Sequence, residues 1–216
     1  MSNDEPLLFI VSSPSGAGKT TLASRLLKTV PALVFSVSHT TRRPRAGEKD
    51  GREYHFVERA DFERLIRENA FLEWAEVHDN LYGTSNAEVE RARGARAILF
   101  DVDHQGARQI KSVRPDAVAV FILPPSMAIL KERLKGRASE DDAAVEARFR
   151  VARSEIAHYG LFDYVLMNDD LERATEQLIS IVRAEECRRG RAAVLAERLL
   201  TETHGFGGTV PPNTKE

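Results

Sequence analysis

Several features are scarce in this chain of 216 residues, and each absence narrows its class. Cys187 is the only cysteine, which excludes an internal disulfide. The 31 basic and 33 acidic residues nearly balance, so a general binder of nucleic acid or of membrane surfaces is not expected. No apolar run reaches bilayer-spanning length, and the start Met1–Pro6 is too polar for a signal peptide. The six histidines show no metal-ligand spacing. We expect a soluble, cytoplasmic protein.

Five short runs rich in apolar and β-forming residues are spread along the chain. Most lack polar alternation, as strands covered on both faces do, and most are separated by segments long enough for a helix. They are Leu7–Ser12, Val34–Ser38, Ala97–Val102, Val118–Leu123 and Tyr164–Asn168. An α/β fold with a parallel five-stranded sheet flanked by helices is therefore predicted. Because ligands of such sheets bind beyond the carboxyl ends of the strands, functional residues are expected directly after each run.

The first run leads through a glycine-rich stretch into a helical pattern, the context of a phosphate-binding loop. This loop consists of Ser13, Pro14, Ser15, Gly16, Ala17, Gly18, Lys19 and Thr20. Small residues let successive backbone N–H groups point at phosphate oxygens, and the helix N-terminus adds a favourable dipole. We expect Lys19 to reach the β- and γ-phosphates and Thr20 to offer its hydroxyl to Mg²⁺. Ser13 stands where the G-x-x-x-x-G-K-[ST] pattern has its first glycine, which requires a negative φ there.

An arginine-rich segment follows the second run. Arg42, Arg43 and Arg45 lie close to Pro44, in a composition unsuited to a core element. The planar forks of arginine suit a phosphate dianion better than lysine does. A solvated basic loop is the alternative, but the position after a strand in a phosphate-handling fold favours anion binding.

Two glutamates lie in the segment Phe71–Val77. If this segment is a strand, Glu73 and Glu76 point to opposite faces, so one of them is expected to be buried and paired. A buried carboxylate accepts hydrogen bonds without donating any, which matches the N1–H and 2-amino groups of guanine. An exposed strand glutamate is the alternative for Glu73 alone.

Two aspartates end the third run. Strand alternation puts Asp101 and Asp103 on one face at the carboxyl end of the strand. A carboxylate at this position can hold Mg²⁺ through water or contact a nucleotide, as a phosphate loop requires.

A further group of arginines surrounds Gly136. A helix is predicted for Met127–Lys135 and ends at Gly136. Arg137 and Arg148, on either side of the next helix start, favour a mobile flap that brings positive charge to a phosphoryl group. The alternative is an ordinary charged helix face.

Three more expectations concern helices. Asp61 is expected to be the N-cap of a helix. Asn168 either contacts the adenine or ribose of a nucleotide or caps the next helix, and Asp170 is an equal candidate for the cap. A terminal helix over Glu185–Thr203 has an apolar side that either a second subunit or the same chain would cover.

Taken in order, these segments resemble the motifs of a bacterial-type guanylate kinase. They are the phosphate loop, Ser38–Arg42, Gly51–Tyr54, Phe71–Trp74, Tyr82–Ser85, Asp101–Asp103, Gly136-Arg137 and Asn168-Asp169. The likeness extends from about Leu7 to Arg189. It implies transfer of a phosphoryl group from ATP to GMP, and to dGMP, with Mg²⁺ as cofactor, in purine nucleotide metabolism. The implied small-molecule partners are GMP and ATP, with no nucleic acid and no membrane.

The resemblance also implies a P-loop NTPase-type domain organisation. The guanylate kinase-like domain spans 7–204, with a core of 7–37, 96–129 and 156–204. A GMP-binding module of about 38–95 and a helical lid of about 130–155 are inserted into this core. Residues 1–6 and 205–216 are expected to be disordered. The choice between a monomer and a homo-oligomer stays open.

Site residues follow from the resemblance by matching positions. The GMP phosphate is assigned to Arg42, Arg45, Tyr54 and Tyr82, and guanine to Ser38, Thr84 and Glu73 with Asp101 or Asp103. The ATP side is assigned to residues 13–20 and Asn168, and Mg²⁺, largely through water, to Thr20 and Asp101. Lys19, Arg42, Arg137 and Arg148 are implied to be catalytic.

Two other functions are weighed against this one. A guanylate-kinase-like interaction module without catalysis would have no use for Lys19, Thr20 or the flap arginines. A related P-loop kinase acting on another phosphorylated acceptor, such as a ribose bisphosphate, would not need the guanine-reading residues Ser38, Glu73 and Thr84.

Overall fold

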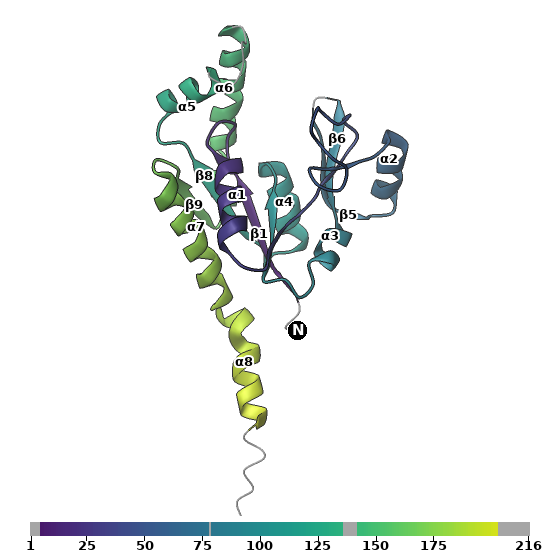
Figure 1. The fold of residues 1–216 in the computed structure, drawn as a ribbon, viewed down its shortest axis with the longest axis vertical. Coiled ribbons are helices and arrows are strands. Elements are labelled where there is room, and N and C mark those ends of the chain that lie inside the picture. The colour runs from purple at the N-terminus through teal and green to yellow at the C-terminus, as the bar shows by residue number, and fades with distance from the viewer. Residues whose placement is uncertain (1–4, 78, 136–141, 203–216) are drawn as a thin grey trace, which may run out of the picture.

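The computed structural model describes residues 5–77, 79–135 and 142–202, in which the strands form two separate sheets (Figure 1). In the larger sheet β1 (Leu7–Ser12) lies between β7 (Ala97–Asp101) and β8 (Val118–Leu123). The edges are β2 (Leu33–Phe35) and β9 (Tyr164–Met167), and all four pairings are parallel. The predicted five-stranded parallel sheet is confirmed.

Helices cover both faces of this sheet. On one face α1 (Lys19–Thr29) and α7 (Leu171–Glu186) pack against alternate residues of β1, including Phe9 and Val11. On the other face α4 (His104–Val113) packs against Ile10 and its neighbours. Every residue of β1 is therefore buried, which explains why its sequence is a continuous apolar run.

A second, four-stranded sheet is inserted between β2 and β7. Its order is β4 (His55–Phe56), β3 (His39–Thr40), β6 (Asn80–Ser85) and β5 (Phe71–Val77). β3 and β4 are parallel, and the other neighbours are antiparallel. The insertion also contains α2 (Arg59–Arg67), and α3 (Asn86–Arg91) leads the chain back to the larger sheet.

Two helices rise beyond the carboxyl ends of the core strands (Figure 1). They are α5 (Met127–Lys135) and α6 (Asp142–Ile156), which pack through Leu130, Leu134, Val145 and Ala152. A short 3₁₀ turn, Tyr159–Leu161, joins α6 to β9. The helix predicted for Met127–Lys135 is confirmed, whereas its expected stop at Gly136 and the flap residue Arg137 lie outside the described residues.

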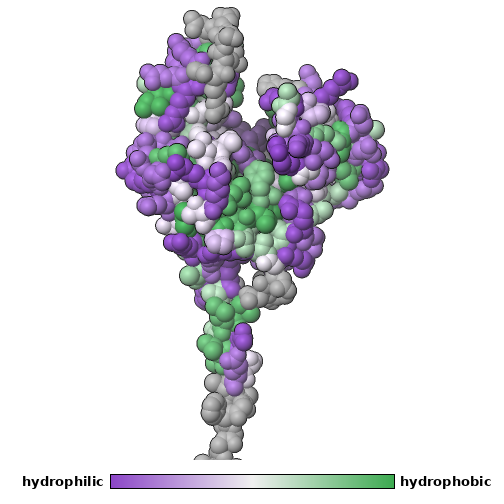
Figure 2. Space-filling model, in the orientation of Figure 1, coloured by the Kyte–Doolittle hydropathy of each residue, from purple (hydrophilic) through white to green (hydrophobic). Residues whose placement is uncertain are grey.

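The prediction of one terminal helix over 185–203 is wrong, because the chain forms two helices there. α7 ends at Glu186, Cys187 is its C-cap, and α8 (Arg189–Glu202) starts anew and extends away from both sheets (Figure 1). The break follows from a tightened last turn, in which the Cys187 N–H bonds to the Ala184 carbonyl. On α8 the side chains Leu195, Leu199 and Leu200 are 59–63% exposed, and apolar surface is visible along the helix in Figure 2. The described part of this chain therefore does not cover them.

Two smaller predictions are wrong, and the choice between two cap residues is settled. The second strand ends at Phe35 rather than Ser38, because the chain turns toward the second sheet after the Ser36 N–H bonds to the Leu99 carbonyl. Helix α2 begins three residues earlier than expected, so Glu58 is its N-cap and Asp61 lies in its first turn. Asp170, not Asn168, caps α7. The expected disorder at the termini concerns residues that, apart from Glu5 and Pro6, lie outside the described part of the chain.

No helix within the described ranges combines the length and the apolar character needed to cross a bilayer.

Candidate active site

The loop between β1 and α1 has the backbone of a phosphate-binding loop. Gly16 and Gly18 have φ of +91° and +96°, in the left-handed region that favours glycine. Ser13 is not among the residues with positive φ, so the serine in place of the first glycine is accommodated, as predicted. The loop is closed by a bond from the Ala17 N–H to the Pro14 carbonyl (3.1 Å).

Asn168 supports this loop from the end of β9. Its side chain is buried, and its Nδ2 donates to the Ala17 carbonyl at 2.7 Å. A Cβ added at Gly18 would lie 2.3 Å from that nitrogen, so the position requires glycine for space as well as for φ. Asn168 is thus held against the loop by a direct bond.

Gly18→Ala is expected to lower the free energy of unfolding by about 2–4 kcal/mol, because left-handed strain and the Asn168 clash add together. Urea denaturation measures this loss. The matched control is Gly47→Ala, which has φ of +89° but nothing within 4 Å of the new Cβ. The control should lose only the strain, about 1–2 kcal/mol, and equal losses in the two variants would contradict the clash.

Lys19 and Asp101 meet at the carboxyl end of the core sheet. β1 and β7 pair so that Val11 lies opposite Asp101, and the Lys19 ammonium forms an ion pair with that carboxylate. Its Nζ also lies 3.5 Å from the Val102 carbonyl oxygen. The structure therefore brings together the lysine and the aspartate that the sequence placed after two different strands.

Helix α6 contacts the same loop at Ser15. Arg148 Nη2 lies 3.4 Å from Ser15 Oγ, and the Ser15 N–H donates to Glu155 Oε2 at 3.3 Å. Arg148 and Glu155 are seven residues apart, so they lie about two turns apart on one face of the helix. Burial raises the pKa of Glu155, partly opposed by the bond from Ser15 and by Lys19.

A cluster beside the second sheet, on the segment between β3 and β4 and on β6, surrounds Arg42. Its Nη1 and Nη2 donate to the two carboxylate oxygens of Glu48 at 3.0 and 2.9 Å. The guanidinium carbon lies 5.4 Å from the ring centre of Tyr54, whose ring makes an edge contact with Tyr82. The hydrogen bond with Glu48, followed by smaller contributions that include one from Tyr82, raises the pKa of Arg42. The Glu48 carboxylate therefore occupies the pair of N–H donors on Arg42 that would also suit a phosphate.

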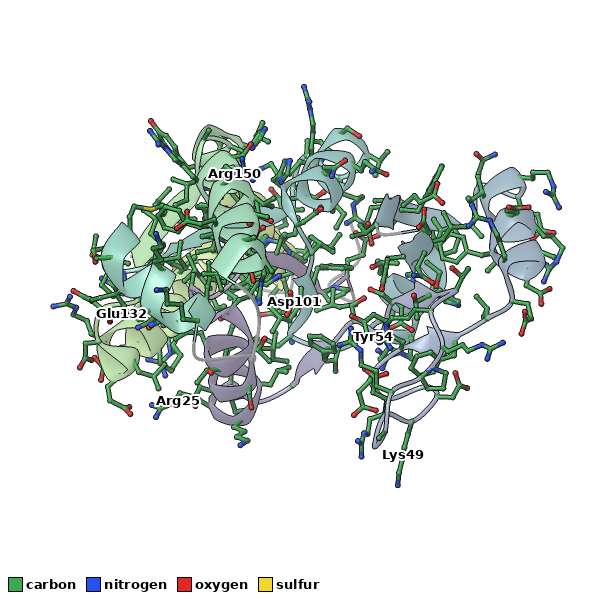
Figure 3. All side chains as sticks on the ribbon, turned by 90° about the horizontal axis from the view of Figure 1, so that it is seen from above. Arg25, Lys49, Tyr54, Asp101, Glu132 and Arg150 are labelled. Carbon is green, nitrogen blue, oxygen red and sulfur yellow. The ribbon has the colours of Figure 1, made fainter. Side chains whose placement is uncertain are left out.

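Tyr54 connects this cluster to the core. Burial raises the pKa of Tyr54, and the nearby carboxylate of Asp101 raises it further. Figure 3 shows the labelled Tyr54 and Asp101 near the boundary between the two sheets. Arg45 is less well placed, since its side chain is exposed and its backbone N–H bonds to Glu48 (2.7 Å).

The residues expected to read guanine also converge. Glu73 and Thr84 are opposite each other in β5 and β6, and Ser38 Oγ lies 3.0 Å from Thr84 Oγ1. Glu73 is 6% exposed, whereas Glu76 is exposed, so the prediction that one of them is buried is confirmed. Burial raises the pKa of Glu73 to about 7, although hydrogen bonds from Thr84 oppose the shift.

Three residues at or in helix α4 lie close to Glu73 or to its neighbours. Asp103 is its N-cap, and Asp103 Oδ1 accepts from the N–H groups of Gln105 and Gly106, both at 2.9 Å. A Cβ at Gly106 would lie 3.0 Å from Glu73 Oε2, so this glycine makes room for the carboxylate. Gln109 brackets the next residue, Trp74, with its amide bonded to the backbone N–H (3.1 Å) and carbonyl (2.9 Å).

Sequence reasoning missed three residues of this site. They are Glu48, Glu155 and Gln109, each identified by its contacts to a predicted residue or its neighbour. The spacing of Glu155 from Arg148 on one helix face was a usable signal. The other two act across turns or between elements, where a single sequence carries no periodic signal.

A cleft of about 410 Å³ lies beside the phosphate loop. It is lined by Gly16, Gly18, Thr21, Arg133, Asn168 and Asp169, together with Leu171. Its volume is within the range of small-molecule sites, and its position suits the nucleoside part of a nucleotide bound at the loop.

The donor set around Lys19 fits a magnesium ion bound mainly by nucleotide phosphates. Thr20 and Asp101 offer a hydroxyl and a carboxylate, the hard oxygen ligands that Mg²⁺ prefers. Among the described residues no group of three or more His, Cys, Asp or Glu side chains is placed to hold a metal.

The fold and the site define a class. A parallel sheet with a phosphate loop, together with an inserted sheet that carries an arginine–tyrosine cluster and a buried carboxylate, is the arrangement of a nucleoside monophosphate kinase. The chain belongs to the guanylate kinase family, whose family model, described as guanylate kinase, matches residues 5–185.

Individual relatives agree with this assignment. The guanylate kinase of Myxococcus xanthus is 50% identical over 190 residues, covering 87% of this chain and 91% of the relative. That of Dechloromonas aromatica is 46% identical over 198 residues, covering 89% and 98%. The crystal structure of the guanylate kinase from Anaplasma phagocytophilum has a TM-score of 0.69 at 34% identity, covering 88% of this chain and 92% of that one.

Proposed function

We propose that this chain catalyses the reaction of its family, the phosphorylation of GMP by ATP, between the two sheets described above. The observation that carries the proposal is that the cluster of Arg42, Tyr54 and Tyr82 and the Lys19–Asp101 ion pair lie toward each other, with Tyr54 and Asp101 near the boundary between the two sheets (Figure 3). Donor and acceptor phosphates bound at these two places would lie near the boundary between the two sheets. In this proposal the core, a GMP-binding module and a lid carry separate roles.

The second sheet would hold GMP. Arg42, with Tyr54 and Tyr82, would bind the phosphate once it replaces Glu48 on the guanidinium fork. Glu73 would accept from N1–H and the 2-amino group of guanine, and the Ser38–Thr84 pair would meet O6. Arg45 would have to swing inward to reach the same phosphate.

The core would hold ATP. The backbone N–H groups of the phosphate loop would bind the phosphates, and Asn168 would contribute from the cleft beside the loop. Thr20 and Asp101 would hold Mg²⁺, which neutralises phosphate charge when bound. Asp103 Oδ1 bonds to the Gly106 N–H and Glu73 Oε2 lies against Gly106, whereas Asp101 pairs with Lys19, so we assign Asp103 to the guanine side and Asp101 to the metal side.

Catalysis in this site needs position and charge rather than a base. The GMP phosphate is already a nucleophile, so the residues have to align it with the γ-phosphoryl group and stabilise the transferring charge. Lys19, which pairs with Asp101, and Arg148, which lies beside Ser15, would do this, and Arg137, outside the described residues, would join them. Closure must also exclude water, since water would otherwise accept the phosphoryl group.

A coupled assay of ADP release tests the function. GMP should give rapid turnover, whereas AMP, UMP and the absence of an acceptor should give only background. Equal rates with AMP would remove the guanine-reading role of Glu73, and no turnover with any nucleotide would favour a binding module without catalysis.

The raised pKa of Glu73 predicts a pH dependence of GMP binding. With a pKa of about 7, this carboxyl group is roughly one-tenth ionised at pH 6 and nine-tenths ionised at pH 8. Only the ionised form can accept both guanine donors, so the KM for GMP should fall about tenfold over this range. The KM for ATP should change little, and steady-state kinetics at several pH values measure both.

Glu73→Gln provides the control for this titration. It should raise the KM for GMP and leave only the dependence that comes from the GMP phosphate, whose own pKa is about 6. A Glu73→Gln variant with the full pH dependence of the unchanged chain would contradict the assignment.

A further inference from the structure

The polypeptide crosses between the two sheets twice. The first crossing is residues 36–38, between β2 and β3, and the second is α3 with residues 92–96, between β6 and β7. Ser38, which faces Thr84 in the guanine-reading group, is the last residue of the first crossing. Any change in the angle between the sheets has to pass through these two segments.

One buried carboxylate joins the two crossings. Glu88 lies on α3 with only 4% exposure, and its Oε2 accepts from the Val37 N–H at 2.8 Å. Arg91, one turn later on α3, donates from Nη2 to Glu88 Oε2 (2.7 Å) and to the Phe35 carbonyl (2.8 Å). The first crossing is therefore bonded to α3 at Val37 within it and at Phe35 directly before it.

The second sheet contributes a third contact to the same group. His55 Nε2, from β4, lies 3.7 Å from Glu88 Oε1, and the His55 ring is 4.7 Å from that of His39, next to Ser38 in the chain. Burial acts to raise the pKa of Glu88, but hydrogen bonds from Arg91 and Val37 outweigh it and lower the pKa. Glu88 is thus held as an anion between three segments.

We propose that Glu88 is a positioning residue for the acceptor site: it binds the first crossing through Val37 and Arg91 and so fixes Ser38 and the second sheet relative to the core. Glu88 touches neither substrate. The inference rests on the proposed function, because it assumes that GMP binds at Ser38, Glu73 and Arg42.

A role in overall stability alone would have a different signature. The ATP side of the site is built from β1, α1, α6 and β9, and none of these contacts Glu88 among the described interactions. Loss of the Glu88 bonds should therefore weaken GMP binding selectively. A loss of general stability would weaken both ligands together.

Two variants of the full chain test the proposal by calorimetric titration with GMP and, separately, with ADP. Glu88→Gln keeps an acceptor for the Val37 N–H but turns an amide toward Arg91 and His55, and should raise the Kd for GMP about tenfold. Arg91→Met keeps the apolar stem, loses the bond to Phe35, and should raise it at least about threefold. The Kd for ADP should stay within about twofold in both.

Glu90→Gln is the matched control, since Glu90 is exposed on the same helix and pairs with Arg93 rather than with either crossing. It should bind GMP and ADP as the unchanged chain does. An unchanged Kd for GMP in both Glu88→Gln and Arg91→Met would overturn the proposal, and so would equal weakening of GMP and ADP. If the unchanged chain bound GMP no better than AMP, the proposed function itself would fail, whatever the variants did.

Discussion

Lys19→Ala is expected to lower kcat by a factor on the order of 10² to 10⁴, the effect of removing one electrostatic stabiliser from a transition state. The ammonium lies at the phosphate loop and is paired only with Asp101 and the Val102 carbonyl among the described contacts. Its loss would leave Asp101 as an uncompensated negative charge at the proposed binding site of the ATP phosphates. A single-turnover measurement, with enzyme and ATP in excess over a limiting amount of GMP, reports the chemical step directly.

The control for Lys19→Ala is Lys28→Ala, an exposed lysine in the last turn of the same helix. It removes the same charge far from the loop and should leave kcat unchanged. The thermal unfolding of Lys19→Ala should stay close to that of the unchanged chain, because the Lys19–Asp101 pair is partly exposed and such pairs stabilise little. Near-normal turnover by Lys19→Ala would remove its catalytic role.

Arg42→Ala is expected to lower kcat/KM for GMP by about 10³, in line with truncating one partner of a hydrogen-bonded charge pair. The guanidinium is held by Glu48 and stacked near Tyr54, so its two donors are already oriented for a phosphate. Arg42→Lys should lose most of the same activity, because an ammonium is a point charge without the fork geometry. Steady-state kinetics with GMP as the varied substrate measure both.

Arg43→Ala is the matched control, an exposed arginine next in the chain. It should change kcat/KM for GMP by less than about threefold, since surface charges act mainly through long-range attraction. Activity of Arg42→Ala within that same range would contradict phosphate binding by Arg42. A double variant with Glu48→Gln should regain part of the loss, because the carboxylate would otherwise remain opposite the GMP phosphate.

The larger sheet was predictable from sequence because each of its strands is marked by a short continuous run of apolar and β-forming residues. The bounds of β1 and β8 agree with the predicted runs, since both strands are buried along nearly their whole length. The second strand was misplaced because Ser36, Val37 and Ser38 continue its β-forming composition while the chain already turns away. Composition cannot report that turn, which depends on the Glu88 and Leu99 contacts.

The second sheet was beyond such reasoning. β3 and β4 have two residues each, too few for any periodicity, and their parallel pairing joins His39 to His55 across sixteen positions of chain. In the site, Glu73 was found because a strand with two glutamates on opposite faces must bury one. Glu48 and Gln109 bond to backbone or to another charged side chain, and such pairings follow from the tertiary fold alone.

The three carboxylates that occupy the proposed substrate positions have one common consequence. Glu48 lies on the Arg42 fork, Asp101 on the Lys19 ammonium and Glu155 on the Ser15 N–H. In the proposed function, each bound phosphate would therefore displace a carboxylate of the protein rather than enter a positively charged site with no anion in it. A small anion such as sulfate gains little from such an exchange, whereas a nucleotide adds the contacts of its base and ribose. The empty protein should consequently resist inorganic anions at concentrations where it binds nucleotides.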